Sequence, residues 1–204
     1  MTLDPLITVV SVLGLGAFTL SGVIEAKRKD MDVVGAAAVA FITAVGGGTM
    51  RDVLLGRYPI FWIEDQRYAL GIFALAVISF YSLRAARLTS SAILVPDALG
   101  LGLFTVTGAS YAIASHTSLA IASLLGVITG VLGGVLRDVV CNEIPSVFAR
   151  TQLYATCALA GAWVYLLLGA AGVIADVAVP AGALATFSLR MAAVRFDLRL
   201  PRPR

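Results

Sequence analysis

The stretch LGLGAFTLSG at residues 13–22 returns as LGLGLFTVTG at residues 99–108, and this repetition decides the fold. Without a gap, the same offset of residue i to residue i + 86 pairs GGGTMRD at residues 46–52 with LGGVLRD at residues 132–138. It also pairs Pro59 with Pro145. One constant offset over such a length predicts that the chain contains a duplicated unit.

The composition is that of a membrane protein. Of the 204 residues, 59% are hydrophobic and only 13% are charged, and the mean hydropathy is +0.95. An ordinary soluble domain carries about 25% charged residues. Residues 6–24 form an uncharged apolar run, long enough to cross a hydrocarbon core of about 30 Å. No basic residue precedes this run, so we expect it to be retained rather than cleaved as a signal peptide.

Apolar runs bounded by charged or turn residues predict an all-α membrane protein with seven transmembrane helices. The third and sixth runs are short for a span. Only LGAAG, at residues 168–172, separates the sixth run from the seventh. The predicted spans are Leu6–Ile24, Val33–Leu55, Tyr68–Leu83, Ala98–Ala114, Leu119–Cys141, Leu153–Leu168 and Val173–Met191.

The repeat must be inverted, because each unit has three spans and an odd number returns the chain to the opposite side. The two units are then related by a pseudo-twofold axis in the membrane plane, which is typical of transport proteins. We expect residues 1–89 to form the first unit and residues 90–170 the second. Residues 171–204 then hold the seventh helix and a basic tail.

The basic residues of the short connections predict the orientation. They follow the first span, the third span and the seventh span, and the positive-inside rule places all three segments in the cytoplasm. We therefore expect a multi-pass protein of the cell membrane with its N-terminus outside and its C-terminus in the cytoplasm. These residues are Lys27, Arg28, Lys29, Arg84, Arg87, Arg195, Arg199, Arg202 and Arg204.

Glycines interrupt the middle helix of each unit at Gly46, Gly47 and Gly48 and again at Gly133 and Gly134. Each glycine costs a helix interior about 1 kcal/mol relative to alanine. Small residues can serve close helix packing. Alternatively, a kinked or unwound turn can expose backbone carbonyls to a water-filled cavity. We favour the kink, because it recurs at the equivalent place in both units.

An Arg-Asp pair follows each set of glycines: Arg51 with Asp52, and Arg137 with Asp138. Neighbours on a helix point about 100° apart, so we expect crossed pairs, Arg51 with Asp138 and Arg137 with Asp52. Such pairs can form a structural clamp. Ionisable groups in a span can also line a polar pathway, and both interpretations remain open.

Hydroxyl side chains repeat with the same offset. In a helix, a hydroxyl can bond its own i−4 carbonyl, or it can face a channel and offer oxygen to a dehydrated cation. The repeated positions are Thr19 and Thr105, Ser21 and Thr107, and Thr43 and Thr129.

Several classes of function lack support. The cysteines and the single histidine, Cys141, Cys157 and His116, match no metal or redox spacing. The basic residues form no stripe for nucleic acid. No nucleophile with a base is visible, so we expect no enzyme. We expect no cofactor and no soluble partner beyond the lipid bilayer.

The doubled Gly-Gly-x-x-Arg-Asp motif in a three-plus-three-plus-one arrangement resembles the prokaryotic branch of the trimeric intracellular cation channel (TRIC) family. The resemblance implies a homotrimer with one pore per protomer, through which potassium is the main ion in transit. It implies that the middle helices bend at the glycines and that Arg51 or Arg137 plugs the pore. Leu132 stands where the first unit has Gly46, so the second bend is expected to be weaker.

A secondary transporter of a small solute, such as the amino acid glycine, also fits an inverted repeat. Unitary potassium currents would favour the channel, and saturable solute counterflow would favour the carrier.

Overall fold

The computed structural model describes residues 5–83, 91–148 and 153–199, and within these ranges the chain forms only helices. Apolar residues dominate each long helix, as the sequence predicted. The helices are α1 (Pro5–Arg28), α2 (Val33–Leu54), α3 (Phe61–Glu64), α4 (Gln66–Ser82), α5 (Leu94–Ala114), α6 (Leu119–Val140), α7 (Ala155–Ala170) and α8 (Ala175–Arg195).

Five of these helices, α1, α2, α5, α6 and α8, are long and apolar enough to span a membrane. The other two predicted spans are α4, with 17 residues, and α7, with 16, and both are short as expected. Gly172 lies between α7 and α8 with φ +82°, which favours glycine, so the predicted break is confirmed. The single turn α3 was not predicted. The fold is the predicted all-α membrane protein of seven transmembrane helices.

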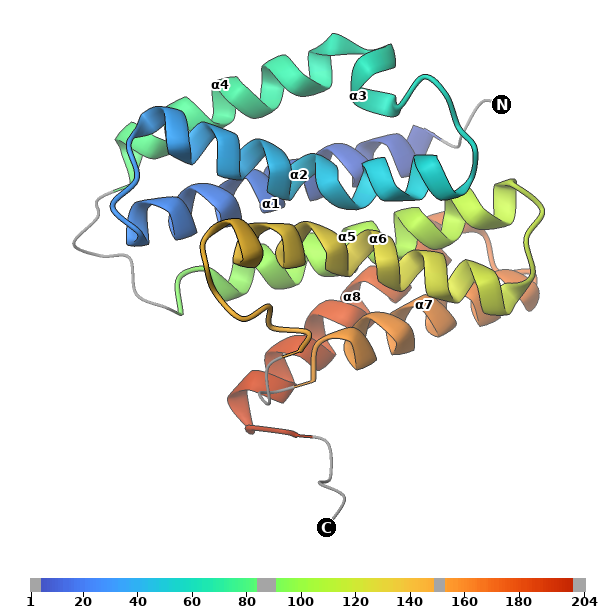
Figure 1. Ribbon diagram of the computed structural model, residues 1–204. Coiled ribbons are helices and arrows are strands. Elements are labelled where there is room, and N and C mark those ends of the chain that lie inside the picture. The colour runs from blue at the N-terminus through green and yellow to red at the C-terminus, as the bar shows by residue number, and fades with distance from the viewer. Residues whose placement is uncertain (1–4, 84–90, 149–152, 200–204) are drawn as a thin grey trace.

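The helices run roughly alongside one another (Figure 1). Helix α1 packs on α2, α4 and α5, and α2 packs on α6. Helices α7 and α8 pack on each other, and α8 also covers α5. The predicted seventh span therefore packs against the repeated core rather than joining its centre.

The inverted repeat is visible where the two units meet. Phe18 and Phe104, which are equivalent under the 86-residue offset, stack with their ring centroids 5.3 Å apart. Gly14 faces the ring of Phe104, and its counterpart Gly100 faces the ring of Phe18. Such reciprocal contacts are the signature of a twofold axis.

The connections repeat the same backbone conformations. Asp30 and His116 both have positive φ, at 53° and 58°. After the next helix in each unit, Gly56 and Asn142 have φ of 64° and 56°. Each of these pairs is separated by 86 residues, so the repeat extends from the helices into the turns.

Most of the predicted cytoplasmic segments gather at one end of the bundle. Lys27 Nζ donates to the carbonyl oxygens of Phe80 and Leu83, both at 2.5 Å, so the end of α1 lies beside the end of α4. Lys29 forms an ion pair with Glu143, in the connection after α6. Residues 84, 87, 202 and 204 lie outside the described residues. Which side of the membrane this end faces stays a prediction.

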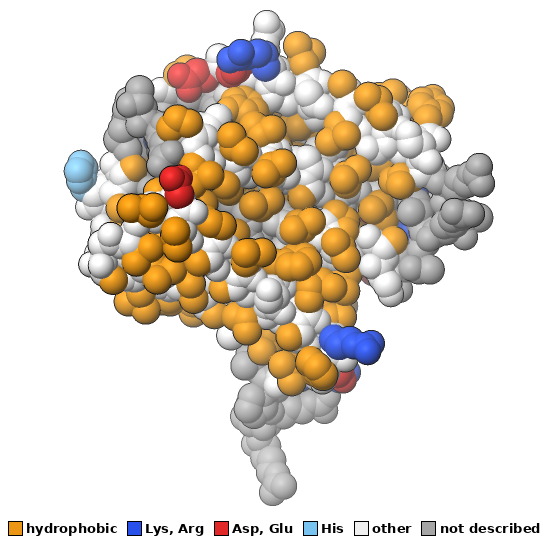
Figure 2. Space-filling view, turned by 180° about the vertical axis from the view of Figure 1, so that it is seen from behind, with side chains coloured by type: hydrophobic (Ala, Val, Ile, Leu, Met, Phe, Trp, Pro, Cys, Tyr) orange, Lys and Arg blue, Asp and Glu red, His pale blue; other side chains and the backbone are white. Residues whose placement is uncertain are grey.

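Apolar side chains cover much of the surface. Figure 2 shows a face dominated by hydrophobic side chains, with most of its charged side chains near the margins. Leu70, Ile78 and Leu184 are each more than 60% exposed. Such a surface suits contact with lipid.

Candidate functional site

The centre of the molecule is the crossing of α2 and α6, where backbone touches backbone. A methyl group placed on Gly47 would lie 2.0 Å from the carbonyl oxygen of Thr129. One placed on Gly133 would lie 2.4 Å from the carbonyl oxygen of Thr43. The two contacts are equivalent under the repeat, so the pseudo-twofold axis passes between them.

The remaining glycines of the motif are also packed closely. An added methyl group would come within 2.5 Å of Leu136 at Gly46, within 2.7 Å of Phe61 at Gly48 and within 2.9 Å of the Tyr154 hydroxyl at Gly134. Both α2 and α6 stay helical through their glycines, so neither contains the unwound turn that we considered. Close packing accounts for these glycines, and a bend within the continuous helices stays a prediction.

The two Arg-Asp pairs lie on opposite sides of the crossing. The helices are antiparallel, and each arginine stands four residues beyond the glycine that contacts the other helix. Arg51 and Arg137 are therefore about 18 Å apart along the helix axes. The expected crossed pairs are wrong: each arginine bonds the aspartate next to it, with Arg51 Nη2 2.8 Å from Asp52 Oδ1 and Arg137 Nη2 2.6 Å from Asp138 Oδ1.

We call Arg51, Asp52, Arg57 and Tyr111 the Arg51 cluster. The Arg51 guanidinium carbon lies 3.7 Å from the centre of the Tyr111 ring, and that of Arg57 lies 4.4 Å from it. Arg57 Nε is 3.7 Å from Asp52 Oδ1, beyond hydrogen-bonding distance. Two guanidinium groups thus share one carboxylate and one aromatic ring.

We call Ser21, Asp97, Arg137 and Asp138 the Arg137 cluster. Arg137 Nη1 donates to Ser21 Oγ and to Asp97 Oδ1, both at 2.5 Å. All four side chains are buried. With two carboxylates and one guanidinium, the formal charge of this cluster is −1. Asp97 stands in the first turn of α5 and pairs with Arg137.

The aspartates also hold the segments that follow their helices. Asp52 Oδ2 accepts a hydrogen bond from the backbone N–H of Phe61, at 3.0 Å. Asp138 Oδ2 accepts one from the backbone N–H of Ser146, also at 3.0 Å. In each unit, one carboxyl oxygen therefore pairs with the arginine and the other accepts a hydrogen bond from the segment after the helix. The Arg-Asp motif thus has a structural role in both units.

Most of the repeated hydroxyls bond their own helix. Thr19, Thr43, Thr107 and Thr129 each donate to the carbonyl oxygen four residues earlier, at 2.6 to 2.8 Å. Ser21 accepts from Arg137 instead. Thr105 Oγ1 is buried and has no hydrogen-bond partner among the described residues. All six side chains are fully buried.

The two clusters differ in charge because their equivalent positions differ. Tyr111 of the first cluster corresponds to Glu25 in the other unit, and Arg57 corresponds to Glu143. Conversely, Asp97 corresponds to the uncharged Ser11. The two clusters of the inverted repeat therefore differ in formal charge, which is +1 for the Arg51 cluster and −1 for the Arg137 cluster.

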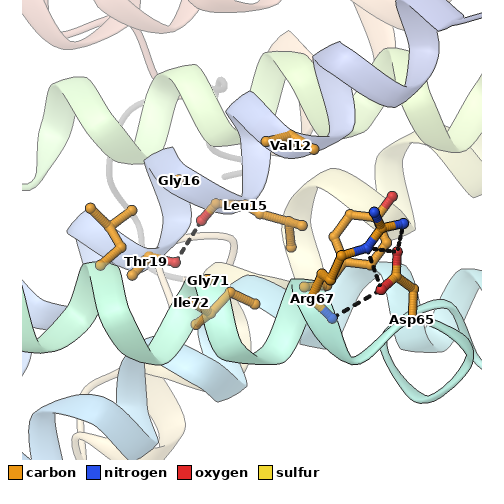
Figure 3. A pocket seen from close by; sticks show the side chains of 10 residues that line it. Val12, Leu15, Gly16, Thr19, Asp65, Arg67, Gly71 and Ile72 are labelled. Carbon is orange, nitrogen blue, oxygen red and sulfur yellow. Dashed lines mark hydrogen bonds and ion pairs between the residues drawn. The ribbon is translucent and has the colours of Figure 1, made fainter.

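A cavity of about 360 Å³ opens between α1 and α4, away from the crossing. Its walls are mostly apolar, with Leu15 and Ile72 among them, and Asp65 and Arg67 form an ion pair at one end (Figure 3). The hydrogen bond from the Arg67 side chain lowers the pKa of the Asp65 carboxyl. Thr19 lines the cavity, but its hydroxyl is bonded to Leu15.

The sequence did not single out Arg57, Tyr111, Tyr154 or Arg190 as site residues. Arg190, on α8, is buried, donates to the carbonyl oxygen of Leu153 at 2.9 Å and lies 4.9 Å from the Tyr154 ring centre. A charge inside an apolar span is a signal that could have identified Arg190. The partners of Tyr111 come from α2 and the connection after it, and no local pattern indicates them.

The chain matches known membrane proteins over most of its length. The family model described as "Glycine transporter" matches twice, at residues 8–84 and 94–170, and the two segments begin 86 residues apart. A UPF0126 membrane protein of Vibrio cholerae is 37% identical over 96% of this chain and 82% of its own length. A UPF0126 inner membrane protein of Escherichia coli K12 is 35% identical over 93% and 92%.

Solved structures agree in fold. A trimeric intracellular cation channel orthologue from Rhodobacter sphaeroides has a TM-score of 0.89 and 38% identity, covering 96% of this chain and 100% of its own. A second TRIC cation channel structure has a TM-score of 0.84 and 34% identity, covering 97% of both chains. The chain belongs to the membrane-protein family that the glycine transporter model describes, and its fold is that of the TRIC channels.

Proposed function

We propose that this protein is a channel for monovalent cations, with potassium as the main ion, and that it works as a homotrimer with one pore in each protomer. The observation that carries the proposal is the similarity to solved TRIC cation channels along 96% of the chain. The N-terminus is outside and the C-terminus is in the cytoplasm in this proposal, because the basic segments gather at one end.

The route for the ion runs past the crossing of α2 and α6, between the two charged clusters. The Arg137 cluster has a formal charge of −1, which favours a cation over an anion at that end of the route. Asp52, Asp138 and the buried hydroxyls offer oxygen atoms that can replace water around the ion. Thr105 supports this role best, because its hydroxyl has no partner among the described residues.

The conformation described here is closed at the crossing. The contacts of Gly47 and Gly133 with opposing carbonyl oxygens leave no room for an ion between the two helices. Conduction therefore requires α2 and α6 to separate or bend. Such a movement breaks the backbone contacts of Gly47 and Gly133 and the packing of the Leu136 side chain against Gly46.

Arg51 is the better candidate for a moving plug, because fewer groups hold it. Arg137 bonds two carboxylates and a hydroxyl, whereas Arg51 bonds one carboxylate and contacts aromatic rings. One charge that crosses the whole membrane field contributes about 2.3 kcal/mol per 100 mV. That energy can shift the position of Arg51 more readily than that of Arg137.

Planar-bilayer recording of the purified protein in asymmetric potassium chloride tests this function. We expect unitary current steps that reverse near the potassium equilibrium potential. Arg51→Ala should raise the open probability, and Arg137→Ala should reduce the amount of folded protein. If neither substitution alters open probability, conductance or folding, the plug assignment is wrong.

A transporter of a small amino acid is the second candidate, favoured by the description of the family model as a glycine transporter. Proteoliposomes loaded with unlabelled glycine separate the two functions. Saturable uptake of labelled glycine by counterflow, without unitary current, would show that the protein is a carrier and not a channel.

A further inference from the structure

We propose that the Arg51 cluster binds a small carboxylate anion, with Arg57 as its main ligand. This site goes beyond the proposed function, since it concerns an anion rather than the conducted cation. It rests on the charge, contacts and burial of the four residues that make the cluster, and on their counterparts in the other unit.

The cluster has more positive charge than its own acid can neutralise. Asp52 is its single carboxylate, and both oxygens are already used. Oδ1 accepts from Arg51 and Oδ2 accepts from the backbone N–H of Phe61. Since Arg51 and Arg57 are both charged at any physiological pH, the formal charge of the cluster is +1.

Arg57 is held less firmly than Arg51, because it has only a long ion pair with Asp52 and a contact with the Tyr111 ring. Its Nε is buried and makes no hydrogen bond among the described residues, and the nearest carboxylate oxygen is 3.7 Å away. The side chain as a whole is 31% exposed, so a solute can reach it from outside. A buried N–H without an acceptor is costly, so the charge of Arg57 is poorly compensated within the chain, and an anion at the exposed part of its guanidinium supplies the missing charge.

The other unit shows what the cluster lacks. The position equivalent to Arg57 holds Glu143, and the position equivalent to Tyr111 holds Glu25. These acids pair with Arg28 and Lys29, so each of the two has a basic partner within the chain. In the Arg51 cluster the equivalent positions hold a second arginine, Arg57, and the neutral ring of Tyr111. The negative charge that would neutralise this cluster must therefore come from a solute.

A carboxylate fits this cluster better than a spherical anion does. The planar guanidinium presents two parallel N–H groups, which match the two oxygens of a carboxylate. The limited exposure of Arg57 restricts the ligand to a small one. Two sources share this chemistry: a simple acid such as acetate, and the carboxylate end of a small amino acid such as glycine.

Equilibrium dialysis of the purified, detergent-solubilised protein against radiolabelled acetate tests the site without any measurement of current. We expect saturable binding that weakens at least tenfold in Arg57→Gln. The matched control is Glu143→Gln, the same position in the other unit, which should bind as the unchanged protein does. Size-exclusion elution checks that each variant is folded.

A second variant keeps the test decisive. Tyr111→Glu places at this position the residue type that the other unit has there, so the cluster acquires its own second carboxylate. Acetate binding should then fall at least tenfold, although both arginines remain. Retention of full binding in Tyr111→Glu would contradict the charge argument even if Arg57→Gln weakened binding.

Competition distinguishes the two sources and the alternatives. Displacement of acetate by glycine at lower concentration than by unlabelled acetate would identify an amino acid as the ligand, and the reverse order would identify a simple acid. Equal displacement by chloride, or no saturable binding of acetate, would overturn the assignment. If the protein conducts potassium but does not bind acetate, the proposed anion site is wrong and the proposed channel function still stands.

Discussion

The carbonyl oxygen of Thr129 occupies the space directly beside Gly47, so that a methyl group there would lie 2.0 Å from it. Thr43 and Gly133 repeat this relationship on the other side of the pseudo-twofold axis, at 2.4 Å. Real side-chain carbons do not approach a carbonyl so closely. The glycines of the repeated motif are therefore fixed by the contact between the two central helices.

Substitution of Gly47 by alanine should destabilise the protein. The methyl group meets backbone, which cannot rotate away as a side chain can, so we expect a loss of about 1–3 kcal/mol or more. For a chain of this size, that loss lowers Tm by roughly 2–4 °C per kcal/mol. Gly71→Ala on α4 is the control, because nothing lies within 4 Å of its added methyl group. Equal melting temperatures of the two variants would contradict the packing at the crossing.

Double-mutant cycles should locate the energetic partners of the arginines. Arg137 and Asp97 are in contact at 2.5 Å, so we expect their changes to alanine to couple by more than about 1 kcal/mol. Arg51 and Asp138 lie on opposite sides of the crossing and should couple by less than about 0.5 kcal/mol. Denaturant-dependent unfolding measures both cycles. A large coupling energy between Arg51 and Asp138 would support the crossed pairs that the sequence suggested and would contradict the pairing described above.

Ser21 and Thr107 occupy equivalent positions but should respond differently to loss of the hydroxyl. Ser21 accepts a hydrogen bond from the Arg137 guanidinium, whereas Thr107 bonds the carbonyl oxygen of Leu103 in its own helix. We expect Ser21→Ala to cost about 1.5–3 kcal/mol, as for a hydrogen bond to a charged group, and Thr107→Val about 1 kcal/mol or less. Thermal unfolding checks the order, and the reverse order would exclude Ser21 from the Arg137 cluster.

The surface pair Lys29 and Glu143 should stabilise the protein over a limited pH range. The hydrogen bond between them lowers the pKa of Glu143 from 4.5, so its contribution is present above that value and is lost as the pH falls through the lower folded pKa. The same bond raises the pKa of Lys29 from 10.5, so its contribution is lost only as the pH rises through the higher folded pKa. The Tm difference between the protein and Glu143→Gln should therefore be largest between these limits.

High salt supplies the control for this pair. Both groups are exposed, so 1 M salt should shrink the difference in Tm through screening. A difference that stayed constant from pH 3 to pH 9 would show that Glu143 acts through something other than its charge.

Much of the fold could be predicted because the repeat can be recognised in the sequence by its constant offset. The 86-residue offset pairs Phe18 with Phe104, and these residues stack on each other at the axis. The single turn at Phe61–Glu64 could not be predicted, because it depends on tertiary contacts with α2. The Phe61 ring lies against Gly48, and its N–H donates to Asp52.

The site was predicted in part. Arg51, Asp52, Arg137 and Asp138 are all buried near the crossing, but the rule that helix neighbours point apart gave the wrong partners. That rule describes the first atoms of a side chain, and the long arginine side chain reaches back to its neighbour. Asp97 and Tyr111 come from α5, so only the tertiary structure reveals that they complete the two clusters.

The most direct test of the channel asks whether ions pass the crossing itself. Thr43→Cys, in a background without Cys141 and Cys157, places a thiol on the residue of α2 whose carbonyl oxygen contacts Gly133, with its side chain beside Gly22 of α1. Ile78→Cys on the exposed face of α4 is the control. Silver ions are monovalent, like potassium, and bind thiols. They should block the unitary current of Thr43→Cys permanently and leave that of Ile78→Cys unchanged. A potassium current that continues unaltered through silver-treated Thr43→Cys would contradict conduction past α2 and α6.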